Sequence, residues 1–312
     1  MDAAPLVGIA AAPVPSGGRA FWLKGRDGAR LRAALFPAMT PVVGGVVLSP
    51  GRTEPIEKYF ETIGELQARG FTVLAHDWRG QGLSQRALPD RLRGHAQGFE
   101  AYLSDYSLML DEAGAKLPHP WVSLAHSMGG GLVLLALSRG ERRLDGVMST
   151  APMIGLAAVS VLPGAAGLIA RAAAVLGLGG VQLQRYDPFA LTFERNRLTH
   201  DRTRFERYMA QLRACPDLAL GGPTWGWLDY ALRAGAVLSR PGIAAAIATP
   251  LTLIGAGEDA LVLSAAAQAF ARAAPNGRYV EAPGAFHEIL METDRVRALF
   301  WREFDALIGR LG

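Results

Sequence analysis

Cysteine is almost absent from this chain of 312 residues, in which Cys215 is the only one. A single cysteine excludes an intramolecular disulfide and any metal cluster held by several thiolates. The fold therefore does not need an oxidising compartment, and we expect a cytoplasmic setting. Residues 1–18 contain no Lys or Arg, so they lack the positive start of a secretory signal, and we predict that they form a flexible leader.

The chain also has only a small excess of positive over negative charge. Charged residues make up 19% of the chain, and its net charge is only +4, without a long basic run. We therefore predict no nucleic-acid partner, and the sequence indicates no protein partner. The small positive excess suits an ordinary solvated surface or a weak attraction to an anionic membrane.

One uncharged stretch, residues 146–170, is long enough to cross a bilayer. Prolines and glycines interrupt it, and its first part has the pattern of a buried strand over residues 144–149. A span there would leave the segments before and after it on opposite sides of the membrane, and no second stretch of that length returns the chain. We therefore predict no membrane span, and keep open only peripheral contact with the inner membrane.

Strand and helix patterns alternate along most of the chain, with short turns between them. This alternation predicts an α/β fold with a mostly parallel sheet and helices on both faces. The expected strands are a hairpin over 21–38, then 42–50, 71–77, 120–125, 144–149, 249–256 and 277–282. The expected helices are 57–70, 98–116, 128–139, 263–274 and one near 293–310.

The alternation stops between residues 152 and 243, which are apolar at first and then polar and aromatic. We predict that 152–243 form a helical cap inserted into a core made of 19–151 and 244–312. Trp225 and Trp227 suit a pocket mouth or an interface. Other apolar side chains suit contact with hydrocarbon, although such residues more often form the packed interior of a cap: Leu156, Val159, Val161, Leu162, Leu168 and Ile169.

Residues 121–137 place Ser127 between an apolar run and three glycines followed by a second apolar run. This pattern is typical of a strand-turn-helix elbow, whose tight turn requires small residues two before and two after the nucleophile. Ala125 and Gly129 meet that requirement. The helix N-terminus behind Ser127 favours developing negative charge, so Ser127 is the candidate nucleophile and the amide of Met128 a candidate oxyanion donor.

A serine nucleophile needs a base and an acid, which in this elbow fold follow it in the order Ser, acid, His. Of the six histidines, only His287 follows a core strand near the C-terminus. Strand 249–256 leads into Glu258 and Asp259, and the order of the residues leaves both open as the acid.

Six motifs in order resemble the monoacylglycerol lipase and lysophospholipase branch of the α/β-hydrolases, across roughly residues 30–310. The resemblance implies an α/β-hydrolase fold, places the triad acid on Asp259, and places the second oxyanion amide on Arg52. Relatives usually have His-Gly where this chain has Pro50-Gly51. The motifs are SPGRTEPIEKYFE, HDWRGQGLSQR, GHAQGFEAYLSD, HSMGGG, GAGEDALV and GAFHEILMETD.

The resemblance implies a serine hydrolase that cleaves esters of one long acyl chain, a lysophospholipid or a monoacylglycerol, through an acyl-enzyme. Its substrate would be a small lipid or ester, and neither a cofactor nor a metal is expected. Two alternatives stay open at this point. One is a short-chain carboxylesterase or another triad hydrolase on the same fold, and the other is a non-catalytic ligand-binding protein.

Overall fold

A single sheet of nine strands organises the computed structural model, which describes residues 1–159 and 163–311. Its central strands are buried at every residue because uninterrupted apolar runs have both faces covered. The order across the sheet is β1-β2-β3-β5-β4-β6-β7-β8-β9. The strands are β1 (Ala3–Ala4), β2 (Arg19–Lys24), β3 (Arg30–Phe36), β4 (Gly44–Ser49), β5 (Phe71–His76), β6 (Trp121–His126), β7 (Gly146–Thr150), β8 (Leu251–Ala256) and β9 (Gly277–Ala282).

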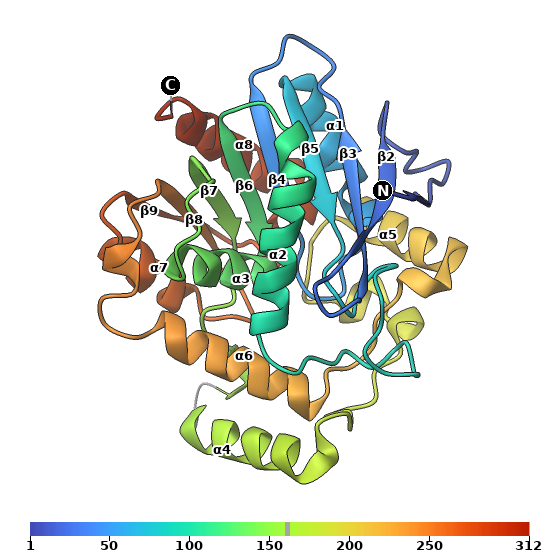
Figure 1. Ribbon diagram of the computed structural model, residues 1–312, viewed down its shortest axis with the longest axis vertical. Helices are drawn as coiled ribbons and strands as arrows, with labels where there is room; N and C mark the ends of the chain where they lie inside the picture. The colour runs from blue at the N-terminus through green and yellow to red at the C-terminus, as the bar shows by residue number, and fades with distance from the viewer. Residues whose placement is uncertain (160–162, 312) are drawn as a thin grey trace.

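The sheet is parallel from β5 to β9, whereas β1, β2 and β3 join it in antiparallel pairs. The predicted mostly parallel α/β sheet is therefore confirmed. The carboxyl ends of the parallel strands lie along one edge, at the lower side of the sheet in Figure 1. In open α/β sheets this edge is where ligands bind.

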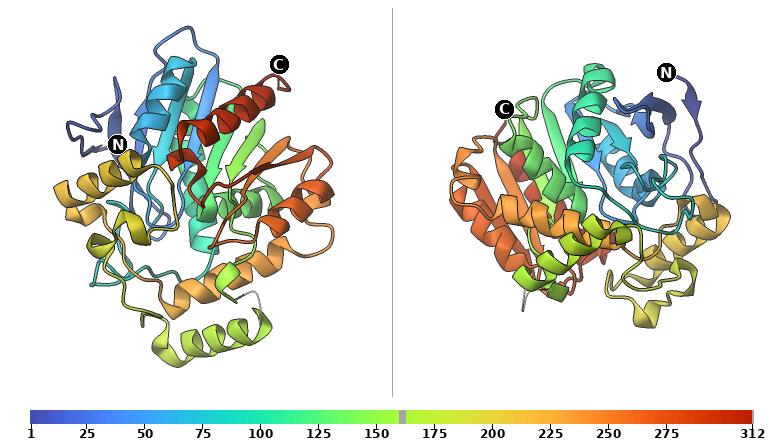
Figure 2. Two further views of the ribbon diagram at one scale, coloured as in Figure 1. Left: turned by 180° about the vertical axis from the view of Figure 1, so that it is seen from behind. Right: turned by 60° about the horizontal axis from the view of Figure 1, so that its bottom comes forward.

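Helices cover both faces of the sheet (Figures 1 and 2). Side chains of α1 and α8 pack into one apolar cluster, and those of α2, α3 and α7 pack into the other on the opposite face. The expected helix over 57–70 begins with a 3-10 turn, Ile56–Tyr59. The core helices are α1 (Phe60–Ala68), α2 (Glu100–Glu112), α3 (Ser127–Ser138), α7 (Ser264–Ala273) and α8 (Asp294–Ile308).

Among the described residues between β7 and β8, in the segment predicted to be a cap, the α-helices are α4 (Pro163–Ala173), α5 (Arg202–Ala214) and α6 (Trp225–Leu238). A π-helical turn, η4 (Ala174–Leu178), continues α4. Helix α4 packs along α6 below the carboxyl edge of the sheet, while α5 lies to the side near the N-terminal strands (Figures 1 and 2). The division into core and cap stays our prediction, and Val161 and Leu162 lie outside the described residues.

Residues 1–18 differ from the flexible leader that we expected. Ala3–Ala4 pair with β2, the carbonyl of Pro5 accepts a hydrogen bond from Arg32 (3.0 Å), and the amide of Val7 donates to Glu57 (3.2 Å). Arg32 and Glu57 form a fully buried ion pair at 2.7 Å. Residues 1–18 thus supply hydrogen bonds to the buried charges of Arg32 and Glu57. The Ala- and Pro-rich sequence of residues 1–18 does not indicate this role.

The uncharged stretch at 146–170 begins with β7, and its last described part, residues 163–170, belongs to α4. Over residues 1–159 and 163–311, the chain forms no helix with the length and apolar character that a bilayer crossing needs.

Candidate active site

The turn between β6 and α3 presents Ser127 at the carboxyl edge of the sheet. Strand β6 ends at His126, and α3 begins at Ser127, whose φ of 48° lies in the left-handed region. A non-glycine residue in that region is strained, and the surrounding packing must hold it there. This is the backbone geometry of a nucleophile elbow.

Gly129 explains why the turn needs so small a residue after the serine. A methyl group at this position would overlap the carbonyl oxygens of Ser49 and Pro50, which belong to β4 and the turn that follows it. Helix α3 therefore reaches the sheet only because position 129 has no side chain.

The structure brings Ser127, His287 and Asp259 together although they are far apart in the sequence. His287 Nε2 lies 2.9 Å from Ser127 Oγ, and His287 Nδ1 lies 2.8 Å from Asp259 Oδ2. All three side chains are largely buried. This is the geometry that lets a histidine accept a serine proton while a carboxylate orients its ring.

Asp259 is held in place by its own backbone. Its Oδ1 accepts hydrogen bonds from the amides of Leu261 (2.8 Å) and Val262 (3.0 Å), which leaves Oδ2 for His287. Burial alone would raise the pKa of Asp259, but the hydrogen bond and the charge of His287 outweigh burial and lower it. Glu258, the alternative acid, is exposed, so the geometry favours Asp259.

The turn after β4 leaves the amide of Arg52 free. The amide of Gly51 donates to Glu54 Oε2 (2.5 Å), and the amide of Thr53 donates to Gln81 Oε1 (2.6 Å). Over the described residues, the amide of Arg52 between them has no protein acceptor. It is available to an anionic oxygen, as an oxyanion hole requires.

A buried charge network lies behind this turn, and our sequence reasoning did not find it. Lys58 Nζ is 2.9 Å from Glu54 Oε1 and 2.5 Å from Glu288 Oε1. It therefore ties the turn that contains Arg52 to the residue that follows His287. Burial would raise the pKa of Glu54, but Lys58, His126 and the hydroxyl of Tyr59 lower it to about 2, so Glu54 is anionic. The spacing of Glu54 and Lys58, four residues apart, was the one signal in the sequence.

His126, next to the nucleophile, belongs to the same buried region. Its Nδ1 lies 2.9 Å from Thr150 Oγ1, and its ring centroid lies 4.8 Å from that of His287. Burial lowers the pKa of His126 to about 4, so it is neutral at neutral pH. Because His126 is neutral, it would not repel a positive charge that forms on His287.

An apolar hollow of about 620 Å³ lies between α4 and α6. Ser127, Asp259 and His287 are not among its lining residues, but Met153 is, and the amide of Met153 donates to the carbonyl of Ser127 (2.9 Å). Met153 therefore connects the hollow to the backbone of Ser127. Leu156, Val159 and Leu168, for which the sequence left open hydrocarbon contact or the cap interior, also line it.

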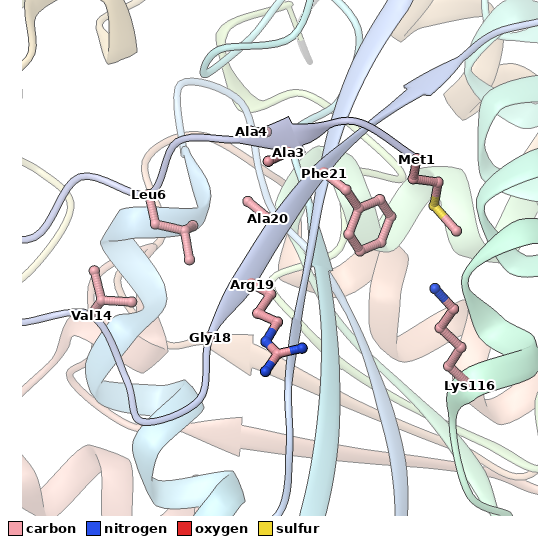
Figure 3. A pocket seen from close by; sticks show the side chains of 10 residues that line it. All are labelled: Met1, Ala3, Ala4, Leu6, Val14, Gly18, Arg19, Ala20, Phe21 and Lys116. Carbon is pink, nitrogen blue, oxygen red and sulfur yellow. The ribbon is translucent and has the colours of Figure 1, made fainter.

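A second hollow, of about 640 Å³, lies beside the N-terminal strands and is shown in Figure 3. It is open to solvent, and its walls come from residues 1–21 and from Lys116, without Ser127, Asp259 or His287. It is therefore separate from the candidate active site.

Known proteins similar to this chain show which family it belongs to. The model of the family described as serine aminopeptidase, S33 (Hydrolase_4) matches residues 40–294. Lysophospholipase L2 of Escherichia coli (strain K12) is 34% identical over 273 residues, which cover 81% of this chain and 77% of that protein. Monoacylglycerol lipase of Mycolicibacterium smegmatis is 25% identical over 276 residues, with coverage of 87% and 90%.

Solved structures share the fold. A soluble variant of monoglyceride lipase from Saccharomyces cerevisiae, in complex with a substrate analog, superposes with a TM-score of 0.76 and 22% identity over 99% of both chains. Monoacylglycerol lipase of Paleococcus ferrophilus superposes with a TM-score of 0.68 and 21% identity, over 89% of this chain and 98% of that one.

Proposed function

The chain belongs to the serine aminopeptidase S33 family and is a carboxylic ester hydrolase with the α/β-hydrolase fold, and from this premise we propose that it hydrolyses lipids with one long acyl chain. The proposed substrates are lysophospholipids and monoacylglycerols, because proteins similar to this chain are named for those activities. The observation that carries the mechanism is the pair of hydrogen bonds that joins Ser127, His287 and Asp259.

In the first half of the proposed reaction, Ser127 Oγ attacks the carbonyl carbon of the ester while His287 Nε2 takes the hydroxyl proton. Asp259 holds the ring so that Nε2 faces Ser127, and it stabilises the positive charge on the imidazole. The negative charge on the carbonyl oxygen is held by the amides of Arg52 and Met128. The bond to the alcohol oxygen then breaks, and His287 returns the proton to the leaving alcohol.

In the second half, water replaces the alcohol. His287 takes a proton from that water, whose oxygen attacks the acyl-enzyme carbonyl at Ser127. The bond to Ser127 Oγ breaks, the serine recovers a proton, and the fatty acid leaves. These steps require only the side chains and amides named above.

The apolar hollow between α4 and α6 is our proposed site for the acyl chain. It has the size of a typical small-molecule pocket, and most of its lining is apolar. It approaches the carbonyl of Ser127 through Met153, so an acyl group on Ser127 would have an apolar region beside it. The short acyl group of a short-chain ester would leave most of this hollow unfilled.

We also propose that the enzyme works in the cytoplasm and docks on the inner membrane through α4 and η4. Large apolar side chains there face solvent: Leu168 and Leu176 are each 75% exposed, Val175 is 68% exposed and Ile169 is 57% exposed. An exposed apolar face of this kind is typical of helices that lie in a membrane interface. The net charge of +4 adds a weak attraction to anionic lipids.

A fluorophosphonate probe tests the nucleophile. We expect the wild type to be labelled and Ser127→Ala to remain unlabelled, with hydrolysis reduced by about 10⁴-fold or more. A circular dichroism spectrum of the variant serves as the control for folding. Labelling of Ser127→Ala, or no labelling of the folded wild type, would contradict the mechanism.

The lipid substrate is tested separately with nitrophenyl esters of increasing chain length, followed by fatty acid release from lysophospholipid and monoacylglycerol. We expect activity to rise toward long acyl chains. Activity that falls from acetate onward would identify the short-chain esterase instead.

A further inference from the structure

The side chain of Arg52 has a different set of partners from its backbone. The guanidinium packs over the ring of Trp227, with 5.2 Å between its Cζ and the ring centroid, and Nη2 donates to the carbonyl of Gly221. It also fills the space beside Gly94, where a methyl group would overlap it. The side chain therefore extends from the turn after β4 toward the first turn of α6.

This guanidinium has no carboxylate partner among the residues that the structure describes. Its Nε is enclosed and makes no hydrogen bond, whereas Nη1 has no protein acceptor and is not enclosed. The nearest acid along the chain, Glu54, is already engaged by Lys58, Tyr59 and the amide of Gly51. Arg52 therefore has free donors.

Arg86 shows what a purely structural arginine looks like in the same protein. It too lacks a carboxylate hydrogen bond, but it donates to five backbone carbonyls, those of Gly82, Ser84, Arg91, Asp217 and Ala219. Arg52 donates to one. Packing alone does not account for a guanidinium so poorly satisfied.

A largely enclosed cation without a counter-ion is costly, because one hydrogen bond and the contact with Trp227 replace only part of the hydration that burial removes. Burial lowers the pKa of Arg52 to about 10, so the group is still protonated at neutral pH. Natural proteins keep such a charge where it has a use, and a guanidinium with free donors binds carboxylate or phosphate groups well.

The position of the Arg52 guanidinium indicates which part of the substrate it would contact. Its own amide is the proposed oxyanion donor, so the guanidinium lies one side-chain length from the ester carbonyl. It packs on the first turn of α6, at Trp227, whereas the apolar hollow lies along later residues of that helix, from Asp229 to Ser239. Arg52 therefore lies apart from the proposed acyl site.

We propose that the Arg52 guanidinium binds the phosphate of a lysophospholipid and so selects it over a monoacylglycerol. This inference rests on the proposed function, because it takes the ester at Ser127 as given. In a lysophospholipid the phosphate is separated from the acyl ester by the glycerol carbons, a span comparable with that between the amide and the guanidinium of one arginine. A monoacylglycerol has only a hydroxyl there.

The test compares two substrates with the same chain, 1-myristoyl-lysophosphatidylglycerol and 1-myristoylglycerol, each in mixed micelles of a neutral detergent. We expect Arg52→Gln to lower the ratio of their kcat/KM values, phospholipid over neutral lipid, by about 10- to 100-fold, the value of a charged hydrogen bond. Arg52→Lys, which keeps the positive charge but loses the planar guanidinium with its several donors, should lower this ratio less. Arg93→Gln, which removes an exposed arginine, is the matched control for net charge.

A ratio that stays constant in Arg52→Gln, even if both activities fall, would overturn the proposal and leave Arg52 with a structural role in the turn. A wild type that cleaves only the neutral lipid would also overturn it while leaving the proposed hydrolase intact. A wild type that cleaves neither lipid would instead contradict the proposed function itself.

Inhibition of the wild type by uncleavable analogues tests the same proposal without a substitution that could disturb the fold. The ether analogues 1-O-alkyl-lysophosphatidylglycerol and 1-O-alkylglycerol cannot be hydrolysed at the ether, and each can be used to inhibit turnover of a neutral nitrophenyl ester. We expect the phospholipid ether to inhibit at a concentration at least about tenfold lower. Equal inhibition would overturn the proposal.

Discussion

Single side chains outside the proposed triad hold its members in position. Lys58 is the clearest case, because its ammonium lies between the carboxylates of Glu54 and Glu288 and is itself buried. Glu54 supports the turn that contains Arg52, and Glu288 follows His287. One cation therefore couples the position of the proposed oxyanion donor to that of the proposed base.

Replacing Lys58 by Met removes that cation and leaves two buried carboxylates close together. We expect the free energy of unfolding to fall by about 3 kcal/mol, since loss of one partner leaves buried charge uncompensated. Urea unfolding measures this change. Lys24→Met, at an exposed lysine at the end of β2, is the control and should change stability little. A Lys58→Met protein as stable as that control would contradict a role for the network.

At the level of elements, α4 and η4 differ from the other helices in what they expose. Core helices bury their apolar faces against the sheet, whereas the segment from Leu168 to Leu178 turns large apolar side chains to solvent. Such a face is unfavourable in water unless something covers it part of the time. A membrane surface is the covering that we propose.

The double substitution Val175→Asp and Leu176→Asp tests this surface without changing the hollow, which these residues do not line. We expect binding to vesicles containing anionic lipid to fall by at least about tenfold, because two apolar side chains lose their burial and two acids are added. Cosedimentation with vesicles gives the bound fraction.

Met39→Asp with Val42→Asp is the matched control for that pair. Met39 and Val42 are 63% and 61% exposed, in the loop between β3 and β4 at the end of the molecule opposite α4 (Figure 1). Equal losses of binding in the two double variants would show that charge, rather than the α4 face, determines the binding.

Across the whole molecule, buried histidines link stability to pH. Burial lowers the pKa of His76 to about 3 and that of His126 to about 4, whereas unfolded histidine titrates near 6.5. Between these values the unfolded chain binds protons that the folded chain does not. Stability from these groups is therefore complete above about pH 6.5 and is lost as the pH falls, toward 4 for His126 and toward 3 for His76.

His126→Asn should remove part of this dependence. We expect the wild type to lose roughly 3 kcal/mol of unfolding free energy through His126 between pH 6.5 and 4, and the variant to lose correspondingly less. Urea unfolding at several pH values measures the slope. His119→Asn, at a histidine with a 68% exposed side chain, should keep the wild-type slope. Parallel curves for wild type and His126→Asn would contradict the assignment.

The sequence by itself determined the elements and the order of the triad. Buried strands and amphipathic helices follow from local patterns of apolar residues, so β4 to β9 and the core helices lie within a few residues of the predicted ranges. Ser127 and His287 could be proposed from the sequence because the fold requires small residues around the first and fixes the chain order of the second. These features depend on near neighbours in sequence.

Tertiary structure alone decided the contacts between distant segments. Whether Glu258 or Asp259 faces His287, whether residues 1–18 are ordered, and which carboxylates Lys58 joins all depend on side chains that meet only after folding. The same holds for Arg52, because its donors are free only in a fold in which the nearby acid Glu54 is bound by other residues. Long-range electrostatics and packing therefore set the site, because a local sequence pattern contains no information about which distant group completes a buried charge.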